Sequence, residues 1–400
     1  MKIHQLDIEG FKSLKKVTWN PSDLNVIIGP NGSGKSNLLR ILELISVAAK
    51  GRLGRYVQRL GGMESLVWDG QLENIIFRVQ TTPDDFSSSH HFVYTTKLVR
   101  TGLSNFFTIG EESLSLNLFS EADRDKFMSA AQHMTQLVRA NRTARIYDEQ
   151  FNRWNISQEP IDAEETILSQ VTGPFANNQR ILTFQNYLDE WAIYHDLRAD
   201  QEAPIRQAPV SRYEKHIAPD GQNLINVLHT LYTSDRDFKR AVNSAMRAAF
   251  GDDFNELVFP PAADQRIQLR VSWKTLKREQ SATDLSDGTL RFLFLIAVLA
   301  NPSPSPLIAI DEPETGLHPS MLPIIAEYAV DAAQRTQVIF TTHSDQFLDA
   351  FTDTKPTTTV TKWIDGETIL KTIDGEELEY WLQEYSLGKL FRSGELENME

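Results

Sequence analysis

GPNGSGKS, residues 29–36, matches the pattern G-x-x-x-x-G-K-[ST] of loops that bind phosphate groups. Glycines let such a backbone come close enough to phosphate oxygens for its N–H groups to donate hydrogen bonds. An apolar strand, Leu24–Ile28, leads into the loop, and an amphipathic helix is expected from Asn37 to about Ala49. We expect Lys35 to reach the β- and γ-phosphates and the Ser36 hydroxyl to bind Mg²⁺. The alternative is a glycine-rich turn without a ligand.

A second apolar strand, Leu307–Ile310, is followed by two carboxylates, Asp311 and Glu312. A strand that is apolar on both faces indicates burial within a parallel sheet. In a protein with a phosphate loop, Asp311 is expected to hold the Mg²⁺ shell and Glu312 to position or deprotonate the attacking water. The alternative is a pair of solvated carboxylates at the end of a strand.

The segment LSDGT, residues 285–289, comes directly before an apolar helix expected at Leu290–Ala300. The start of a helix carries unpaired N–H groups and a partial positive charge, which suit an anion. This segment resembles the signature motif of ABC ATPases. Asp287 departs from the many signatures that have glycine at this position, and we expect its carboxylate to face away from the phosphate and to cap the helix.

The complete set of motifs resembles the SMC/RecF/OLD-like branch of the ABC-type P-loop ATPases, which includes stand-alone bacterial AAA-family ATPases of phage-defence and DNA-repair systems. The matching segments lie between about residues 3 and 344 in the expected order: GFKS at 10–13, GPNGSGKSN at 29–37, LSDGT at 285–289, DEPETGLHP at 311–319 and TTHS at 341–344. The resemblance implies an α/β protein with a P-loop NTPase fold of the ABC/SMC-head type, an antiparallel β subdomain and a helical insertion.

The same resemblance implies how the protein works. Ser286 and Gly288 of one subunit would bind the γ-phosphate that the other subunit holds, so that ATP closes a homodimer and hydrolysis opens it. His343, which ends another apolar strand, would sense the γ-phosphate. The alternatives are that Ser286 is only a helix cap and that His343 is only a polar residue at the end of a strand.

Two more residues are candidates for contact with the nucleotide. Lys12 follows the amino-terminal strand, with a solvated lysine as the alternative, and Gln170 is the candidate for the Q-loop ligand, with Gln58 and Gln158 as competitors. The expected catalytic residues are Glu312, His343 and Lys35. The residues expected to bind ATP are Asn31, Gly32, Ser33, Gly34, Lys35, Ser36, Asn37, Ser286, Gly288, Lys12 and Gln170. The expected Mg²⁺ ligands are Ser36, Asp311 and Gln170.

The hydrophobic pattern divides the chain into three expected parts. Residues 1–119 would form an amino-terminal ATPase lobe, in which the strand-rich stretch 73–118 indicates an antiparallel meander. Residues 120–220 would form a helical insertion and connector, helical from about 120 to 197, and residues 221–400 a carboxy-terminal ATPase lobe. Arg139, Arg142 and Arg145 lie three residues apart, which is typical of a shared, solvated helix face.

Composition restricts the classes of function. The net charge is −14, so contact with DNA requires a partner protein or a local basic patch, for which Lys50, Arg52, Arg55 and Arg59 are the candidates. These residues suit the carboxyl end of a helix equally well. The chain has no cysteine, which fits a reducing compartment. Its most apolar run, 292–300, is shorter than the roughly 20 residues that span a bilayer, and we expect a cytoplasmic protein.

These observations predict an ATP-binding and ATP-hydrolysing switch that dimerises around ATP. The resemblance implies a role in DNA repair or phage defence, with a separate nuclease or toxin-like effector as the partner. The alternative is the nucleotide-binding subunit of an ABC transporter. The GFKS segment at 10–13, the large insertion and the ETGLHP segment at 314–319 count against that alternative.

Overall fold

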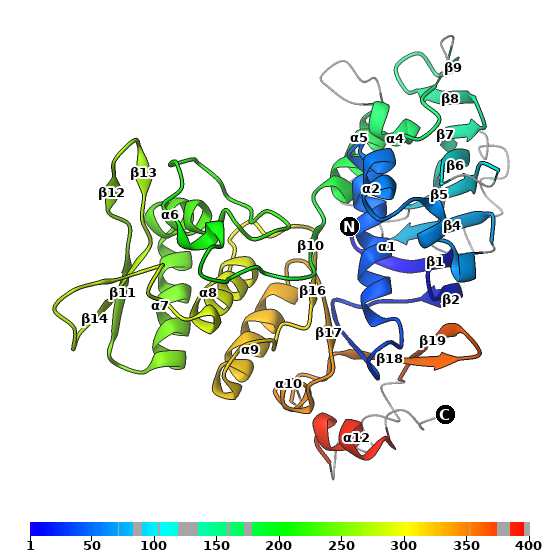
Figure 1. Ribbon diagram of the computed structural model, residues 1–400. Coiled ribbons are helices and arrows are strands. Elements are labelled where there is room, and N and C mark those ends of the chain that lie inside the picture. The colour runs from blue at the N-terminus through cyan, green and yellow to red at the C-terminus, as the bar shows by residue number, and fades with distance from the viewer. Residues whose placement is uncertain are drawn as a thin grey trace. The chain divides into compact units, whose positions relative to one another are not determined.

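The computed structural model divides the chain into two compact units (Figure 1). The first unit holds Met1–Ser22, Gly29–Trp191 and Thr359–Thr372, and the second holds Asp23–Ile28, Ala192–Thr358 and Ile373–Glu400. The structure describes residues 1–70, 72–82, 90–102, 105–118, 135–157, 161–171, 178–351, 353–373 and 385–395.

An eight-stranded sheet forms the framework of the first unit, and every neighbouring pair of its strands is antiparallel. The predicted antiparallel subdomain is therefore confirmed, and it extends beyond the expected stretch at 73–118. In spatial order the strands are β2 (Leu14–Trp19), β1 (Ile3–Phe11), β4 (Asn74–Thr81), β5 (His90–Arg100), β6 (Phe107–Leu118), β7 (Thr135–Ala140), β8 (Thr143–Asp148) and β9 (Arg153–Ile156).

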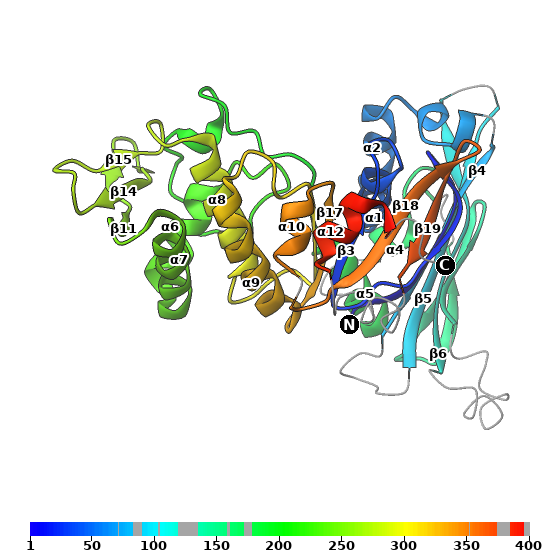
Figure 2. The same cartoon turned by 90° about the horizontal axis from the view of Figure 1, so that it is seen from below.

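Helices cover one face of this sheet, as Figure 2 shows. The central one is α1 (Lys35–Ala49), whose apolar side chains are buried because its amphipathic stripe faces the other helices and the sheet. Phe184 packs its ring against Phe92 and Tyr94 of β5, with ring centroids 5.1 and 5.5 Å apart. The smaller elements are α2 (Leu53–Arg59), α4 (Ile167–Gln170), α5 (Gln179–Asp189), η1 (Met63–Ser65) and η2 (Trp68–Gly70).

The prediction of continuous helix from 120 to 197 is wrong over residues 135–156, which form β7, β8 and β9. Ala140 pairs with Thr143, so only two residues join β7 to β8, and the first of them, Asn141, has φ +52°. A short connection led by asparagine in the left-handed region is a typical hairpin turn. The charged side chains on both sides of this turn concealed the two strands in the sequence.

The three arginines of this segment consequently do not share a helix face. Arg142 and Arg145 are exposed, but the Arg139 side chain is buried in β7. Its guanidinium donates hydrogen bonds to the carbonyl oxygens of Asn141, Asp162 and Glu165 at 2.8, 2.8 and 2.7 Å. Arg139 thus ties the chain that leads into α4 to the sheet.

Four parallel strands form the centre of the second unit, in the order β10 (Ala192–Tyr194), β16 (Leu307–Asp311), β17 (Gln337–Thr342) and β3 (Leu24–Ile28). As predicted from their apolar sequences, β3 and β17 are fully buried and β16 is buried up to its last residue. The carboxyl ends of parallel strands meet at one edge of a sheet, which is where ligands bind in α/β proteins.

Helices and short strands complete this unit, and α8 and α9 pack against each other beside the sheet (Figure 1). The helices are α6 (Leu224–Ser234), α7 (Arg236–Phe250), α8 (Asp287–Leu299), α9 (Leu322–Ala333), α10 (Asp345–Asp349), α12 (Leu387–Ser393), η4 (Pro204–Arg206) and η5 (Pro319–Met321). The short strands are β11 (Phe254–Val258), β12 (Pro261–Ala262), β13 (Arg266–Ile267), β14 (Arg270–Trp273) and β15 (Gln280–Ser281). Among the described residues, no helix is long and apolar enough to cross a membrane.

The compact units do not follow the three segments expected at 1–119, 120–220 and 221–400. β3 belongs with the second unit because it pairs with β17, more than 300 residues later in the chain. The hairpin of β18 (Thr357–Ile364) and β19 (Glu367–Thr372) places residues 359–372 in the first unit, where the Thr368 amide donates to the Ser13 carbonyl at 2.8 Å. Pairings this distant have no local sequence signal.

Replacing Arg139 with methionine should destabilise the protein, because three carbonyl groups would lose the buried guanidinium that donates to them. We expect the free energy of unfolding in urea to fall by about 3 kcal/mol or more. The matched control is Arg142→Met in the neighbouring turn, where a change within about 0.5 kcal/mol is expected. Equal effects of the two substitutions would contradict the role assigned to Arg139.

Candidate functional site

The phosphate loop begins directly after β3 and ends in the first turn of α1. Gly34 precedes the helix with φ +103°, a conformation that favours glycine. The Lys35 side chain is buried, and its ammonium donates to the carbonyl oxygens of Gly29 and Pro30 at 2.7 and 3.1 Å. Asn31 and Gly32 are exposed at the apex. The predicted loop and its helix are therefore both present.

A group of hydroxyl side chains supports this loop. Thr361 of β18 forms a hydrogen bond with the Ser33 hydroxyl, and Thr368 of β19 donates to the Ser33 carbonyl at 2.8 Å. A Cβ atom on Gly34 would lie 2.1 Å from Oγ1 of Thr368, so no larger residue fits there. Ser13 joins the group, since it accepts from Asn37 Nδ2 at 2.8 Å. Neither threonine belongs to a sequence motif, and the sequence analysis missed both.

Lys12 lies at the turn between β1 and β2 with φ +49°. Its ammonium donates to the Ser65 carbonyl at 3.2 Å, which directs the side chain toward η1. Partial burial lowers the pKa of Lys12, and the nearby Arg40 lowers it further. The contact of Lys12 with the nucleotide stays a prediction.

The structure contradicts Gln170 as a nucleotide and Mg²⁺ ligand. Thr166, the cap of the short helix α4, donates to the Ala48 carbonyl at 2.7 Å, so α4 lies at the carboxyl end of α1. The phosphate loop lies at the other end of this 15-residue helix, about 20 Å away. Gln58 of α2 also follows the carboxyl end of α1 in the chain, and Gln158 lies outside the described residues.

The edge of the parallel sheet brings together three of the predicted residues, Asp311, Glu312 and His343. Asp311 ends β16 opposite Thr341 of β17, whose hydroxyl donates a hydrogen bond to the Asp311 carboxylate. Glu312 follows with φ +46°, a strained conformation for a residue with a side chain. One Glu312 carboxylate oxygen lies 3.1 Å from Nδ1 of His343. The two side chains therefore form a hydrogen-bonded pair at the sheet edge.

Glu314 is a buried acid next to this pair, and the sequence analysis gave it no role. One oxygen accepts hydrogen bonds from the Thr342 hydroxyl and from the His343 amide, the latter at 3.3 Å. The other oxygen is buried without a hydrogen-bond partner among the described residues. Burial raises the pKa of the Glu314 carboxyl, and the hydrogen bond from Thr342 only partly opposes it.

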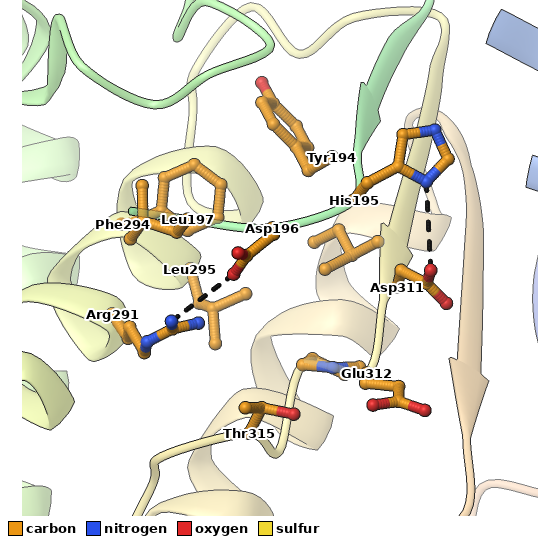
Figure 3. Close-up of a pocket in the computed structure, with 12 residues that line it drawn as sticks. Tyr194, His195, Asp196, Leu197, Arg291, Phe294, Leu295, Asp311, Glu312 and Thr315 are labelled. Carbon is orange, nitrogen blue, oxygen red and sulfur yellow. Dashed lines mark hydrogen bonds and ion pairs between the residues drawn. The ribbon is translucent and has the colours of Figure 1, made fainter. Parts of the chain in front are cut away.

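A cavity of about 270 Å³ opens beside the acidic strand end (Figure 3). Its wall includes His195 and Asp196, which directly follow β10, and Arg291 of α8. His195 Nδ1 lies 3.8 Å from the Asp311 carboxylate because Tyr194 pairs with Ile310, the residue before Asp311. The three residues of β10 are too few to be recognised as a strand from sequence, so His195 was missed.

Ser286 is the cap of α8, and its hydroxyl accepts a hydrogen bond from the Thr289 amide at 3.1 Å. The expectation that Asp287 caps the helix is wrong, because its carboxylate is instead bonded to Arg206. Gly288 packs tightly: a Cβ atom there would lie 2.7 Å from the Gly316 carbonyl oxygen. Ser286 and Asp287 are exposed and Gly288 is partly exposed.

The candidate basic patch is partly neutralised. Lys50 lies 3.9 Å from an Asp189 carboxylate oxygen, and Arg59 lies 3.6 Å from a Glu43 oxygen. The other two members, Arg52 and Arg55, are exposed. Two of the four cations therefore have an acidic neighbour, which weakens the patch as a site for DNA phosphates.

Comparison with known proteins supports these assignments at the level of the fold. A family profile described as AAA domain, putative AbiEii toxin, Type IV TA system matches residues 24–349. An SMC head bound to the C-winged helix domain of ScpA is 15% identical with a TM-score of 0.56, covering 95% of this chain and 100% of that one. A second structure is an SMC head with an extended coiled coil, bound to the carboxy-terminal domain of ScpA and derived from Pyrococcus furiosus. It is 15% identical with a TM-score of 0.52, and the match covers 96% of this chain and 99% of that one. No curated protein matches the sequence.

Replacing Glu314 with glutamine should change how stability depends on pH. Folding raises the pKa of Glu314, so the protonated side chain stabilises the folded protein. This stabilisation is fully present below the pKa of the unfolded chain, about 4.3, and is lost as the pH rises through the pKa of the folded protein. We expect Glu314→Gln to raise the thermal midpoint relative to the parent by about 2 °C or more at pH 8, and by less at pH 4.5. A difference independent of pH would contradict the burial argument, and the exposed Glu327→Gln is the control.

Proposed function

The chain belongs to the family of AAA domains described as putative AbiEii toxin, Type IV TA system, and from that premise we propose that it is an ATP-hydrolysing switch that dimerises around ATP. It is an SMC-like P-loop ATPase in its fold. The observation that carries the proposal is the hydrogen-bonded pair of Glu312 and His343 beside Asp311, in a chain that also has a complete phosphate loop.

The proposed reaction gives Glu312 the chemical step and His343 the task of orienting Glu312. The Glu312 carboxylate orients a water molecule and accepts its proton as the water oxygen attacks the γ-phosphorus. The bond from this phosphorus to the β–γ bridging oxygen breaks, and ADP and phosphate are the products. His343 holds the Glu312 carboxylate through Nδ1 and directs it, and the strained backbone of Glu312 aims this side chain toward His343.

The donor set also fits bound ATP with Mg²⁺. The backbone of residues 31–34 and the Lys35 ammonium would hold the phosphates, and Ser36 and Asp311 would hold the ion. Among the described residues, no group of three His, Asp or Glu side chains could hold a metal alone. Mg²⁺ usually takes one or two protein ligands and completes its shell with phosphate and water. The ion would neutralise charge on the phosphates.

Ser286 is exposed at the start of α8, where a second copy could present a γ-phosphate to it. We propose that ATP joins two copies in this way and that hydrolysis separates them. The similar SMC heads are described with domains of ScpA bound to them, which supports a separate partner protein for this chain. We propose that this partner is a nuclease or toxin-like effector in phage defence or DNA repair. The transporter alternative is not favoured, because the similar structures are SMC heads.

Lys35→Ala should abolish ATP binding, because the phosphates lose the one ammonium that the loop provides. Isothermal titration with ATP and Mg²⁺ measures this directly. The exposed Lys16→Ala is the control and should bind ATP as the parent does. Unchanged affinity in the Lys35 variant would refute the assignment of the phosphate loop.

Glu312→Gln should keep ATP binding but lower the rate of hydrolysis by about 100-fold or more, because the amide cannot accept the proton of water. The ATP-bound dimer should then accumulate and be visible by sedimentation. Glu327→Gln on the exposed face of α9 is the matched control and should turn over normally. Normal hydrolysis by the Glu312 variant would remove this residue as the base.

A further inference from the structure

Arg206 lies beneath the loop that carries Ser286, and only 3% of its side chain is exposed. Nε donates to the carbonyl oxygens of Ala199 and Asp200 at 2.9 and 3.0 Å. Nη1 donates to those of Ala282 and Leu285 at 3.1 and 2.6 Å. One planar guanidinium thus joins the connector, residues 195–206, to the backbone that leads into α8, a geometry that the point charge of a lysine does not reproduce.

The remaining edge of the same guanidinium binds the Asp287 carboxylate through Nη2. Asp287 is the first residue of α8, next to Ser286, and 62% of its side chain is exposed. A carboxylate at this position competes with an incoming anion, because both are attracted to the same positively polarised helix start. The positive charge of Arg206 compensates the carboxylate of Asp287, the residue that stands where many signature motifs have glycine.

We propose that Arg206 is a positioning residue of the signature loop, which orients Ser286 and neutralises Asp287 so that the start of α8 can accept an anionic phosphate. The inference rests on the proposed function for the identity of that anion, the γ-phosphate bound by a second copy. Arg206 acts through Asp287 and the loop backbone and does not itself contact the phosphate.

A second ion pair connects the same two parts of the chain. Asp196, at the start of the connector, lies 3.4 Å from Arg291, which is one helical turn beyond Asp287 in α8 (Figure 3). The connector therefore holds the first two turns of α8 by charges of opposite sense, Arg206 on Asp287 and Asp196 on Arg291. The start of the connector is also where His195 approaches Asp311, so the signature helix and the acidic strand end are attached to one short segment.

The test measures dimer formation in the Glu312→Gln background, with ATP and Mg²⁺, by sedimentation. Arg206→Met should leave the ATP affinity of the monomer within about twofold and raise the dimer dissociation constant about tenfold or more. Adding Asp287→Asn to Arg206→Met should restore most of the dimer affinity, because the uncompensated carboxylate is then gone. A purely structural role of Arg206 would not be rescued in this way, since the carbonyl groups would still lack their donor.

Three further variants complete the design. Arg206→Lys keeps the charge and should fall between the parent and Arg206→Met. Arg198→Met removes an exposed arginine of the same connector, paired with Asp200 at 2.6 Å, and should behave as the parent. If Arg206→Met does not fold, Asp287→Asn alone decides: unchanged or tighter dimerisation supports the proposal, and weaker dimerisation overturns it.

Failure of this inference and failure of the proposed function give different results. If the Glu312→Gln parent dimerises with ATP and Arg206→Met dimerises equally well, only the role of Arg206 is overturned. The same holds if Asp287→Asn gives no rescue. If the parent remains monomeric with ATP, the proposed switch is refuted, and the inference fails with it.

Discussion

The parallel register of β16 and β17 is the constraint on which the proposed chemistry depends. It sets Asp311 opposite Thr341, whose hydroxyl bonds the Asp311 carboxylate, and brings Glu312 within hydrogen-bonding distance of His343. The same sheet pairs Thr342 with Ile28, the last residue before the phosphate loop. A shift of one residue would turn every side chain of the strand to the opposite face, so the register has to be strictly specified. Since β17 is buried on both faces and β16 is buried up to its last residue, such a shift would misplace packed side chains on each face.

The buried side chains of Arg206, Arg139 and Glu314 are each tolerated in a defined way. Arg206 satisfies its donors with backbone carbonyl groups and Asp287, and Arg139 uses carbonyl groups in the same manner. Glu314 has one oxygen without a partner among the described residues, and its raised pKa favours the neutral form. Burying an ion without compensation is costly, so arginines with many acceptors and acids that can take up a proton are the stable solutions.

Elements whose sequence pattern lies within one short segment were predicted correctly, and elements that depend on distant residues were not. The phosphate loop, the strands at 24–28 and 307–311, and the apolar helix after residue 289 carry their signals within about ten residues and appear as expected. Gln170 was chosen by its type and approximate position alone, and α4 places it at the wrong end of α1. The charged side chains of β7–β9 conceal a period of two, so the sequence predicts helix where the structure has strands.

The phosphate loop, the acidic strand end and the helix start at Ser286 can be identified from the amino-acid sequence, because each is a continuous segment whose chemistry requires its residue types in that order. The distant residues that support these segments became visible in the folded chain. Thr361 and Thr368 reach the loop, His195 reaches Asp311, and Arg206 reaches Asp287 through pairings between segments far apart in the chain. Such contacts depend on strand order and on the path of the connector, and no spacing within a single sequence records either.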